Sequence, residues 1–341
     1  MRESEAIGAN VHEGAAGVGM FAARRRLVSA LAALLFGSGL RAQSLPPAVA
    51  LIVAVPPGGS GDSIGRLVAE NLSDLMDTRI RVENVGGNGG VTGINAVASA
   101  SRDGSVFGLV TSSGLIGGRI LSRSAQYNPS QDFEWLAILG SYANAMVLST
   151  RSNFTSLADW LAFARRTTTP LAYGTFGTGS AGHLAGAYLR YEQGANLTHV
   201  TVPGADEGYA MLNDGRIDVL FDGVPNALVK VPRSGQRIVA VTSAARQAAL
   251  PDVPCFGELF KESFVVWIAL VLPKGVPPAI YVRFASAVGV LVSEARYADS
   301  LRAAGLSFMG LSGSGTRTFV DNEFLRIARL IARLNDEGMR R

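Results

Sequence analysis

The chain alternates short apolar runs with longer segments in which apolar residues recur at helical spacing. Residues 49–55 form an almost unbroken apolar run, which is typical of a buried strand. In 63–75, by contrast, Ile64, Val68 and Leu72 recur every four residues and predict an amphipathic helix. Further strands are predicted at 79–83, 106–110, 135–139, 145–149, 171–173, 198–202, 217–221, 237–242 and 265–272. Further helices are predicted at 91–100, 157–165, around 209–212, 278–304 and 316–337. Another is predicted after the glycine-rich loop at 174–183 and ends at residue 191. The helix at 157–165 is expected to have Thr155 or Ser156 as its cap.

Strands that alternate with helices predict an α/β fold, in which crossover helices join mainly parallel sheets. The 341 residues are enough for two domains. Since no flexible linker interrupts the pattern, we expect the chain to cross between two lobes through strands, near 145–150 and 262–270. We therefore predict one lobe from 43–147 and 264–341, with a second lobe, 148–263, inserted into it.

The N-terminal region has the features of a signal peptide. Three arginines at 24–26 precede an apolar run, 27–40, that is too short to span a bilayer comfortably. We expect translation to begin at Met20 and the mature protein to begin near Gln43. Export by the Sec route or, given the arginines, by the Tat route would place it in the periplasm. A buried N-terminal helix is the alternative. No later segment approaches transmembrane length without charges, so we expect the mature protein not to span the membrane.

Composition and charge narrow the class of protein. Apolar residues make up 48% and charged residues 17%, which is typical of a well-packed globular chain. The formal net charge is +4, of which +2 belongs to the first 42 residues and +2 (4 − 2) to the rest. A charge that weak and dispersed argues against a nucleic-acid partner. Cys255 is the one cysteine, so an internal disulfide is excluded, and we expect it to be a packed apolar residue.

Three loops rich in glycine and hydroxyl residues share one design, because each follows a strand and precedes a helical start. They are 56–62, 111–114 and 174–180. Ligands of open parallel sheets bind at the carboxyl ends of strands, where helix N-termini offer unpaired N–H groups. None of the three loops holds Lys or Arg, so we expect them to bind a small carboxylate rather than a triphosphate; plain strand–helix turns are the alternative. The candidate binding residues here are Pro57, Gly58, Gly59, Ser60, Asp62, Thr111, Ser112, Ser113, Thr175, Phe176, Gly177, Thr178, Gly179 and Ser180.

Four side chains in or near these loops have individual expected roles. Asp62 is expected to cap the first helix. His183, another candidate binding residue, lies in the first turn after the third loop, which it could also buttress, whereas His199 lies in a strand and is expected to be structural. Asp222 follows the strand 217–221 and either meets an ammonium or hydroxyl of the ligand or is a turn residue.

A dinucleotide site is the main rival. Gly177, Gly179 and Gly182 form a G-x-G-x-x-G pattern after a strand and before a helix. The acid that should follow the next strand, Asp206, comes late, and the export signal argues against an NAD-dependent oxidoreductase. A Walker lysine, G-x-S-x-G and H-E-x-x-H are all missing from the sequence. We therefore expect no catalytic residues, no metal and no cofactor.

Several sequence blocks follow one another in a fixed order along the chain. They include "VPPGGSGDSIGRLVAENLSDLMDTRIRVENVGGNGGVTGINAVASASRDGSVFGLVTSS", "YNPSQDFEWLAILGS", "LAYGTFGTGSAGHLAG", "GRIDVLFDGVPNAL", "RIVAVTSAARQAALPDVPCFGEL" and "LVLPKGVPPAIYVRF". Together these blocks resemble the receptors of tripartite tricarboxylate transporters, often called Bug proteins, and the similarity runs from about residue 48 to the C-terminus.

The resemblance implies a monomeric, two-lobed periplasmic binding protein, not an enzyme, which passes a small organic acid to transporter subunits that it meets transiently. It also implies that the loops matching 56–62 and 174–183 grip the ligand carboxylate from opposite lobes. Positions 111–113 and Asp222 match cleft positions of the family. A homologue that serves in signalling is an alternative.

This chain departs from the family pattern at three places. Val55 stands where an aromatic residue is usual, and Phe176 stands where a small polar residue is usual. Val202-Pro203-Gly204 replaces the usual Tyr-Lys-Gly, and Gly204 is the remaining candidate binding residue. These changes favour a less polar pocket, suited to an aromatic or branched carboxylate.

Overall fold

The structure is a computed structural model that describes residues 45–303 and 305–334. The expectations about Met20, the signal peptide and Gln43 lie outside these residues. From Leu45 onward the chain forms one compact unit. Its strands are β1 (Ala48–Val53), β2 (Arg79–Asn84), β3 (Val106–Thr111), β4 (Phe133–Leu148), β5 (Leu171–Thr175), β6 (Leu197–Thr201), β7 (Val219–Gly223), β8 (Arg237–Val241), β9 (Val265–Pro273) and β10 (Ser307–Ser312). Its α-helices are α2 (Ser60–Met76), α3 (Val91–Ala98), α4 (Arg119–Leu121), α5 (Leu157–Ala164), α6 (Ala181–Tyr191), α7 (Ala205–Asp214), α8 (Val224–Ser234), α9 (Phe256–Phe260), α10 (Pro278–Ser293), α11 (Ala295–Ala303) and α12 (Ser314–Leu334).

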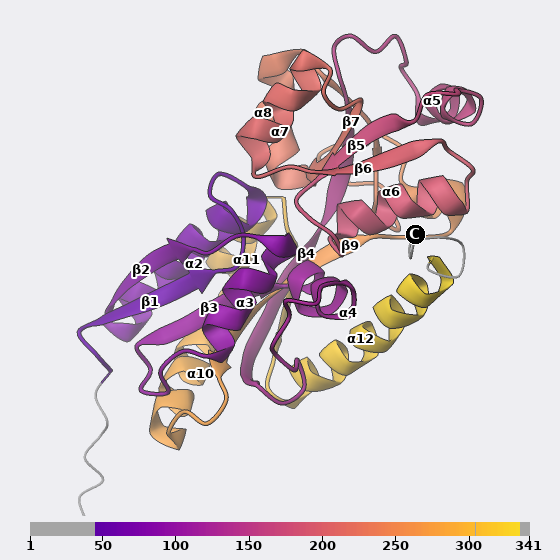
Figure 1. The fold of residues 1–341 in the computed structure, drawn as a ribbon. Helices are drawn as coiled ribbons and strands as arrows, with labels where there is room; N and C mark the ends of the chain where they lie inside the picture. The colour runs from indigo at the N-terminus through magenta and orange to yellow at the C-terminus, as the bar shows by residue number, and fades with distance from the viewer. Residues whose placement is uncertain (1–44, 304, 335–341) are drawn as a thin grey trace, which may run out of the picture. The chain divides into compact units, whose positions relative to one another are not determined.

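Two sheets share the long strand β4, which Figure 1 shows running through the centre of the fold. In the first sheet the order is β2-β1-β3-β9-β4, with β10 on the other edge of β4. In the second sheet the order is β4-β7-β5-β6, with β8 on the other edge of β4. Residues 133–143 of β4 pair with β9, and residues 144–148 pair with β7. The chain thus passes from one sheet to the other inside a strand, near a crossing expected from the sequence.

The α/β prediction is confirmed, and the strand directions refine it. The pairs β1–β2, β1–β3, β5–β6 and β5–β7 are parallel, as crossover helices require. The strands at the junction behave differently, because β4 is antiparallel to β7, β8, β9 and β10. Because these pairs are antiparallel, segments far apart in the sequence can pair with β4 without the crossover helix that a parallel pair requires.

Some predicted boundaries were wrong for identifiable reasons. The two apolar runs at 135–139 and 145–149 are one strand, β4; Gly140 resembles a break but makes room for β10, since a Cβ there would lie 2.5 Å from the Ser307 carbonyl oxygen. The helix predicted at 278–304 is two helices, α10 and α11, which meet at a 72° bend. At that bend Glu294 is extended, with φ −80° and ψ 127°.

Other elements were not predicted. Helix α8 was not predicted; Pro225 lies in its first turn, where proline is well tolerated, and Pro232 lies inside it. Glycines at 305, 310 and 313 concealed β10. Two short helices, η1 (Asn88–Gly90) and the π-helical η2 (Ser113–Gly118), are also rich in glycine. Both lie beside the pocket described below.

The core follows the alternation of side chains along β4. Tyr142, Met146 and Leu148 join the main apolar cluster, whereas Ala143 and Val147 point into a second cluster beneath α7 and α8. Cys255 is fully buried in that second cluster, as the sequence predicted. Within the described residues, no single helix is long and apolar enough to cross a membrane; α10 and α11 reach that length and composition only as a bent pair.

Candidate functional site

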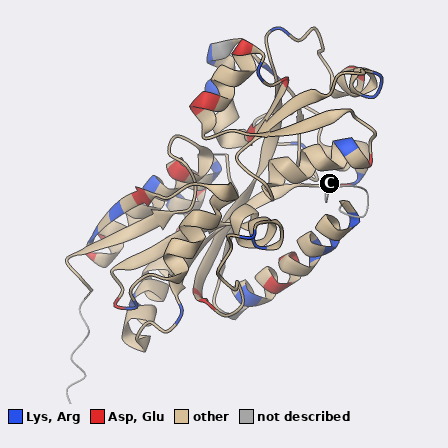
Figure 2. Ribbon diagram, viewed as in Figure 1, with Lys and Arg blue, Asp and Glu red and all other residues tan. Residues whose placement is uncertain are grey.

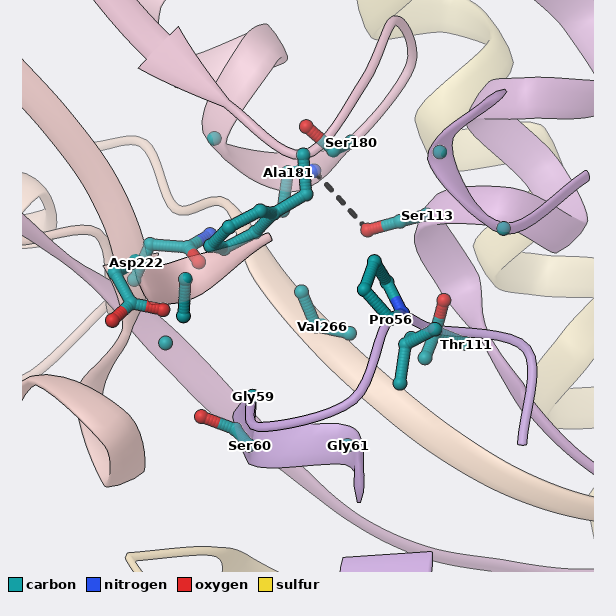
Figure 3. A pocket seen from close by; sticks show the side chains of 18 of the residues that line it. Pro56, Gly59, Ser60, Gly61, Thr111, Ser113, Ser180, Ala181, Asp222 and Val266 are labelled. Atoms are coloured by element: carbon teal, nitrogen blue, oxygen red, sulfur yellow. Dashed lines mark hydrogen bonds between the residues drawn. The ribbon is translucent and has the colours of Figure 1, made fainter. Parts of the chain in front are cut away.

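A pocket lies where the two sheets meet, lined by the ends of β1, β3 and β7 and by the starts of α2, α6 and α7 (Figure 3). Its atom-free space, including the part open to solvent, is about 700 Å³. Nine of the predicted residues line it: Pro57, Gly59, Ser60, Thr111, Ser113, Phe176, Ser180, Gly204 and Asp222. The other predicted residues are not part of the lining: Gly58, Asp62, Ser112, Thr175, Gly177, Thr178, Gly179 and His183.

Helix N-termini converge on this pocket. α2 begins after Gly59 and α7 begins after Gly204, and neither helix has a side-chain cap. α6 begins after Ser180, whose side-chain oxygen accepts a hydrogen bond from the His183 N–H (3.2 Å). The first turn of a helix carries N–H groups without intrahelical partners and a partial positive charge. The three helix starts therefore present hydrogen-bond donors and positive potential to one small space.

Direct contacts join the two sides of the pocket. The Ala181 N–H at the start of α6 donates to Ser113 Oγ of η2 at 3.2 Å, as Figure 3 shows. Close by, Gly117 of η2 touches Gly179 backbone to backbone: a Cβ on Gly117 would lie 1.9 Å from the Gly179 carbonyl oxygen. Gly89 and Gly177 approach similarly, since a Cβ on Gly177 would lie 2.5 Å from the Gly89 nitrogen. Only glycine permits these approaches.

The same contacts account for the G-x-G-x-x-G pattern. Gly177 and Gly179 adopt positive φ (135° and 84°) and pack against the backbones of η1 and η2. Gly182 packs on Phe221, because a Cβ there would lie 2.7 Å from the Cβ of Phe221. Two of the three glycines therefore face protein backbone rather than an open groove, which disfavours a pyrophosphate at this loop.

The pocket holds one ionisable carboxyl group and, among the described residues, no lysine or arginine lines it. Figure 2 shows the charged residues mainly on the peripheral helices. Asp222 is 1% exposed, and burial raises the pKa of its carboxyl group to about 6. Its Oδ2 accepts a hydrogen bond from Asn226 Nδ2 at 2.5 Å. Asp222 therefore lines the pocket while one of its carboxyl oxygens is already hydrogen-bonded to a residue in the first turn of α8.

Asp62 holds the first glycine loop in place without lining the pocket. Its carboxylate accepts hydrogen bonds from the Gly58 N–H (2.9 Å) and from Asn84 Nδ2 (3.0 Å), and it pairs with Arg66 (3.0 Å). The prediction that Asp62 caps the first helix was therefore wrong: the residue before α2 is Gly59, and Asp62, the third residue of α2, reaches back to the loop. Burial raises the pKa of this carboxyl group, but the hydrogen bonds from Gly58, Asn84 and Arg66 outweigh burial and lower it overall.

Replacing Asp62 by alanine should lower the free energy of unfolding by about 2 kcal/mol, because the partly buried Gly58 N–H and Asn84 amide lose a charged acceptor. In the wild type this stabilisation should be present above the usual Asp pKa near 4 and lost as the pH falls below it, since the folded-state pKa is lowered. Urea unfolding measures both effects. Asp74→Asn, an exposed change on the same helix, is the control and should alter stability by less than about 0.5 kcal/mol. Equal stability of the wild type and Asp62→Ala would contradict this role.

His183 supports the third loop, as the sequence predicted. Its Nδ1 accepts a hydrogen bond from the Gly179 N–H at 3.1 Å, and its ring lies 4.4 Å from the His199 ring, centroid to centroid. His199 Nε2 in turn bonds Thr175 Oγ1 at 2.6 Å. Burial lowers the pKa of His183 to about 3 and that of His199 to about 4. Two neutral imidazoles therefore hold the third loop by hydrogen bonds, one to the Gly179 N–H and one to the Thr175 hydroxyl.

Sequence reasoning missed several residues of the pocket wall. Gly89 and Gly90 belong to a run, 86–90, whose four glycines were a usable signal. Tyr142 and Asn144 carried no such signal, since they lie in the interior of β4. The remaining unpredicted lining residues are Ala54, Val55, Pro56, Gly61, Ala181, Gly182, Ala205, Phe221, Gly223 and Val266. The described residues bring together no group of three His, Cys, Asp or Glu side chains that could hold a metal ion.

Known proteins share this sequence and fold. A family model described as "Tripartite tricarboxylate transporter family receptor" matches residues 64–336. Protein BugT of Bordetella pertussis is 27% identical over 286 residues, which cover 83% of this chain and 88% of that protein. A UPF0065 protein of Agrobacterium vitis, from the TAR-I ttuE-ttuC' intergenic region, is 31% identical over 242 residues, covering 70% of each chain. Among solved structures, R. palustris Rpa4515 with adipate matches at a TM-score of 0.80 and 25% identity, covering 85% of this chain and 98% of that one.

Two α/β sheets joined by a shared strand, with a pocket at the junction, define the class as a periplasmic binding protein fold. Because the family model spans most of the sequence, the chain belongs to the tripartite tricarboxylate transporter receptor family. The resemblance seen in the sequence is thereby confirmed. This family is one of solute receptors rather than of enzymes.

Proposed function

We propose that this protein is a periplasmic receptor that binds one small organic carboxylate in the pocket and delivers it to a tripartite tricarboxylate-type membrane transporter. The observation that carries the proposal is the convergence of the α2, α6 and α7 N-termini on one pocket that no lysine or arginine lines among the described residues. Each helix start contributes roughly half a positive charge. Such a site can offset a single negative charge without a cationic side chain.

The lining also supports a ligand with an apolar body. Val55 and Phe176, two of the departures from the family pattern, both line the pocket, together with Pro56, Phe221 and Val266. A small polar acid would leave these surfaces in contact with water, whereas an apolar chain or ring would cover them. An aromatic, branched or long-chain carboxylate therefore fits better than citrate. The related R. palustris protein was solved with adipate, an acid whose middle part is apolar.

The proposed route of the ligand follows from the two-sheet arrangement. The predicted lobes, 43–147 with 264–341 and 148–263, would close on the acid, and the hydrogen bond between Ser113 and the start of α6 would help to hold them together. Closure would present a new surface to the transporter, which the receptor would meet transiently and as a monomer. Export by the N-terminal signal would place the mature chain in the periplasm.

The test is a binding panel on the purified mature chain. Adipate, phenylacetate, benzoate, 4-methylvalerate, citrate and glutamate are titrated by calorimetry, and NAD is included as the rival ligand. We expect at least one acid to bind with micromolar affinity, those with an apolar body to bind more tightly than citrate or glutamate, and NAD not to bind. Binding of NAD without any acid would contradict the proposal. Preference for citrate or glutamate would contradict the apolar ligand class alone.

A further inference from the structure

Asn144 stands out among the residues that line the pocket. It lies in β4 opposite Gly223 of β7, at the point where β4 leaves the first sheet. The side chain is 5% exposed. Its Nδ2 is buried and has no hydrogen-bond partner in the described part of the chain. Buried side-chain donors are nearly always paired, so an unpaired donor in a pocket wall needs an explanation.

Other polar side chains of the pocket already have partners within the protein. Ser60 Oγ accepts a hydrogen bond from the Asn226 N–H at 3.2 Å, and Ser113 Oγ accepts one from the Ala181 N–H at 3.2 Å. Asp222 is engaged by Asn226 Nδ2. The Nδ2 atom of Asn144 thus differs from these atoms, because it is buried and makes no hydrogen bond within the described residues.

The backbone of Asn144 is fixed independently of its side chain. Its N–H donates to Thr242 Oγ1 at 2.9 Å, and its carbonyl accepts from the Thr242 N–H at 2.9 Å. The fold therefore holds this position on the strand whatever side chain it bears. A side chain whose donor makes no hydrogen bond within the described fold, and which belongs to the wall of the pocket, is available to a ligand.

We infer that Asn144 is a ligand-binding and specificity-determining residue, whose Nδ2 donates a hydrogen bond to an oxygen of the bound acid. The inference rests on the proposed function, and it adds a neutral side-chain donor to the backbone donors of the helix starts. A donor of this kind favours acids that place an acceptor oxygen at the junction of the two sheets. It disfavours analogues that place an ammonium or another donor there, because two donors would then face each other.

The experiment compares Asn144→Ala and Asn144→Asp with the wild type, using the tightest-binding acid of the calorimetric panel. Asn144→Ala should weaken binding by about tenfold or more, the loss expected for a hydrogen bond to a charged group. Asn144→Asp should weaken it further, because a carboxylate would replace the donor beside an anion. The melting temperature of ligand-free Asn144→Ala should not fall, since the fold loses no hydrogen bond.

Asn71→Ala is the matched control. Asn71 Nδ2 donates to the Leu67 carbonyl at 2.7 Å within α2, and Asn71 does not line the pocket. This change should leave the affinity unchanged. Affinity of Asn144→Ala within about twofold of the wild type would overturn the assignment of Asn144 while leaving the proposed function intact. Failure of every acid to bind the wild type would instead overturn the proposed function, and this inference with it.

Discussion

Replacing Gly117 by alanine should weaken binding of the carboxylate by about a hundredfold, which corresponds to roughly 2.8 kcal/mol. The added methyl group would lie 1.9 Å from the carbonyl oxygen of Gly179, and the obstacle is backbone rather than a flexible side-chain end. The loop before α6 must therefore move away from η2. The start of α6 would then lose its place beside Ser113, and the ligand would keep only part of its donors. Calorimetric titration with the tightest-binding acid measures the loss.

Two further variants make this result interpretable. Gly289→Ala adds the same methyl group to α10, where nothing lies within 4 Å, so affinity should stay unchanged and stability should rise by up to about 1 kcal/mol. Ser113→Ala removes only the hydrogen bond from Ala181 and should lower affinity less than Gly117→Ala does. Wild-type affinity in a folded Gly117→Ala protein would contradict the claim that contact between the two sides is needed for binding.

The free energy of unfolding should fall as the pH is lowered from about 7 to about 5, and the buried histidine pair should supply most of the fall. In the unfolded chain both imidazoles take up protons near pH 6.5. In the folded chain burial lowers the pKa of His183 to about 3 and that of His199 to about 4, so both stay neutral. The unfolded state then binds more protons, and each histidine removes about 2 kcal/mol over this interval. The loss of stability caused by this histidine pair should be absent well above pH 6.5, where both imidazoles are neutral in the unfolded chain as well.

The comparison with His183→Gln isolates this effect, since other groups titrate in the same range. Asp222 acts in the opposite direction, because burial raises its folded-state pKa to about 6 and protonation then favours the folded state. That contribution is common to both proteins and cancels in their difference. Urea unfolding at the two pH values should show about 2 kcal/mol less pH dependence in His183→Gln. An identical pH dependence in both proteins would contradict a neutral, buried His183.

The sequence predicted those parts of the fold that depend on local pattern. Ile64, Val68 and Leu72 gave α2, and the apolar run before Pro56 gave β1, because burial of one helix face or one whole strand leaves a periodic record. Ser156 was among the two predicted caps, and its side chain accepts the Asp159 N–H as a cap should. The local pattern did not predict β4 as one strand, because Gly140 resembles a break in the sequence. Gly140 is required by its contact with β10, which lies more than 160 residues away.

The candidate site was predictable where it is built from loops and not where it is built from strands. The glycines around Ser60 and Ser180 mark helix starts that must approach another group closely, and a single sequence shows this directly. Asn144 lies in the interior of a strand, between two alanines, and nothing local indicates that its donor would be left unpaired. The same holds for Val266 of β9, which reaches the pocket only because β9 pairs with β4.

The behaviour of Asp62 and His183 shows a third case. The sequence predicted both as binding residues, whereas neither belongs to the lining of the pocket and each instead holds its loop by a hydrogen bond. Proximity in sequence identifies neighbours of a site, but whether a side chain faces the ligand or the supporting layer depends on packing. We therefore expect both residues to affect binding only through the loops that they hold.

A crystal structure of the protein with its tightest-binding acid tests the central claim most directly. The account predicts that the carboxylate oxygens lie within hydrogen-bond distance of backbone N–H groups from the first turns of both α2 and α6, with Asn144 Nδ2 on an oxygen of the same molecule. A ligand carboxylate held by an arginine or lysine elsewhere, or contacts to one of the two helix starts only, would contradict it.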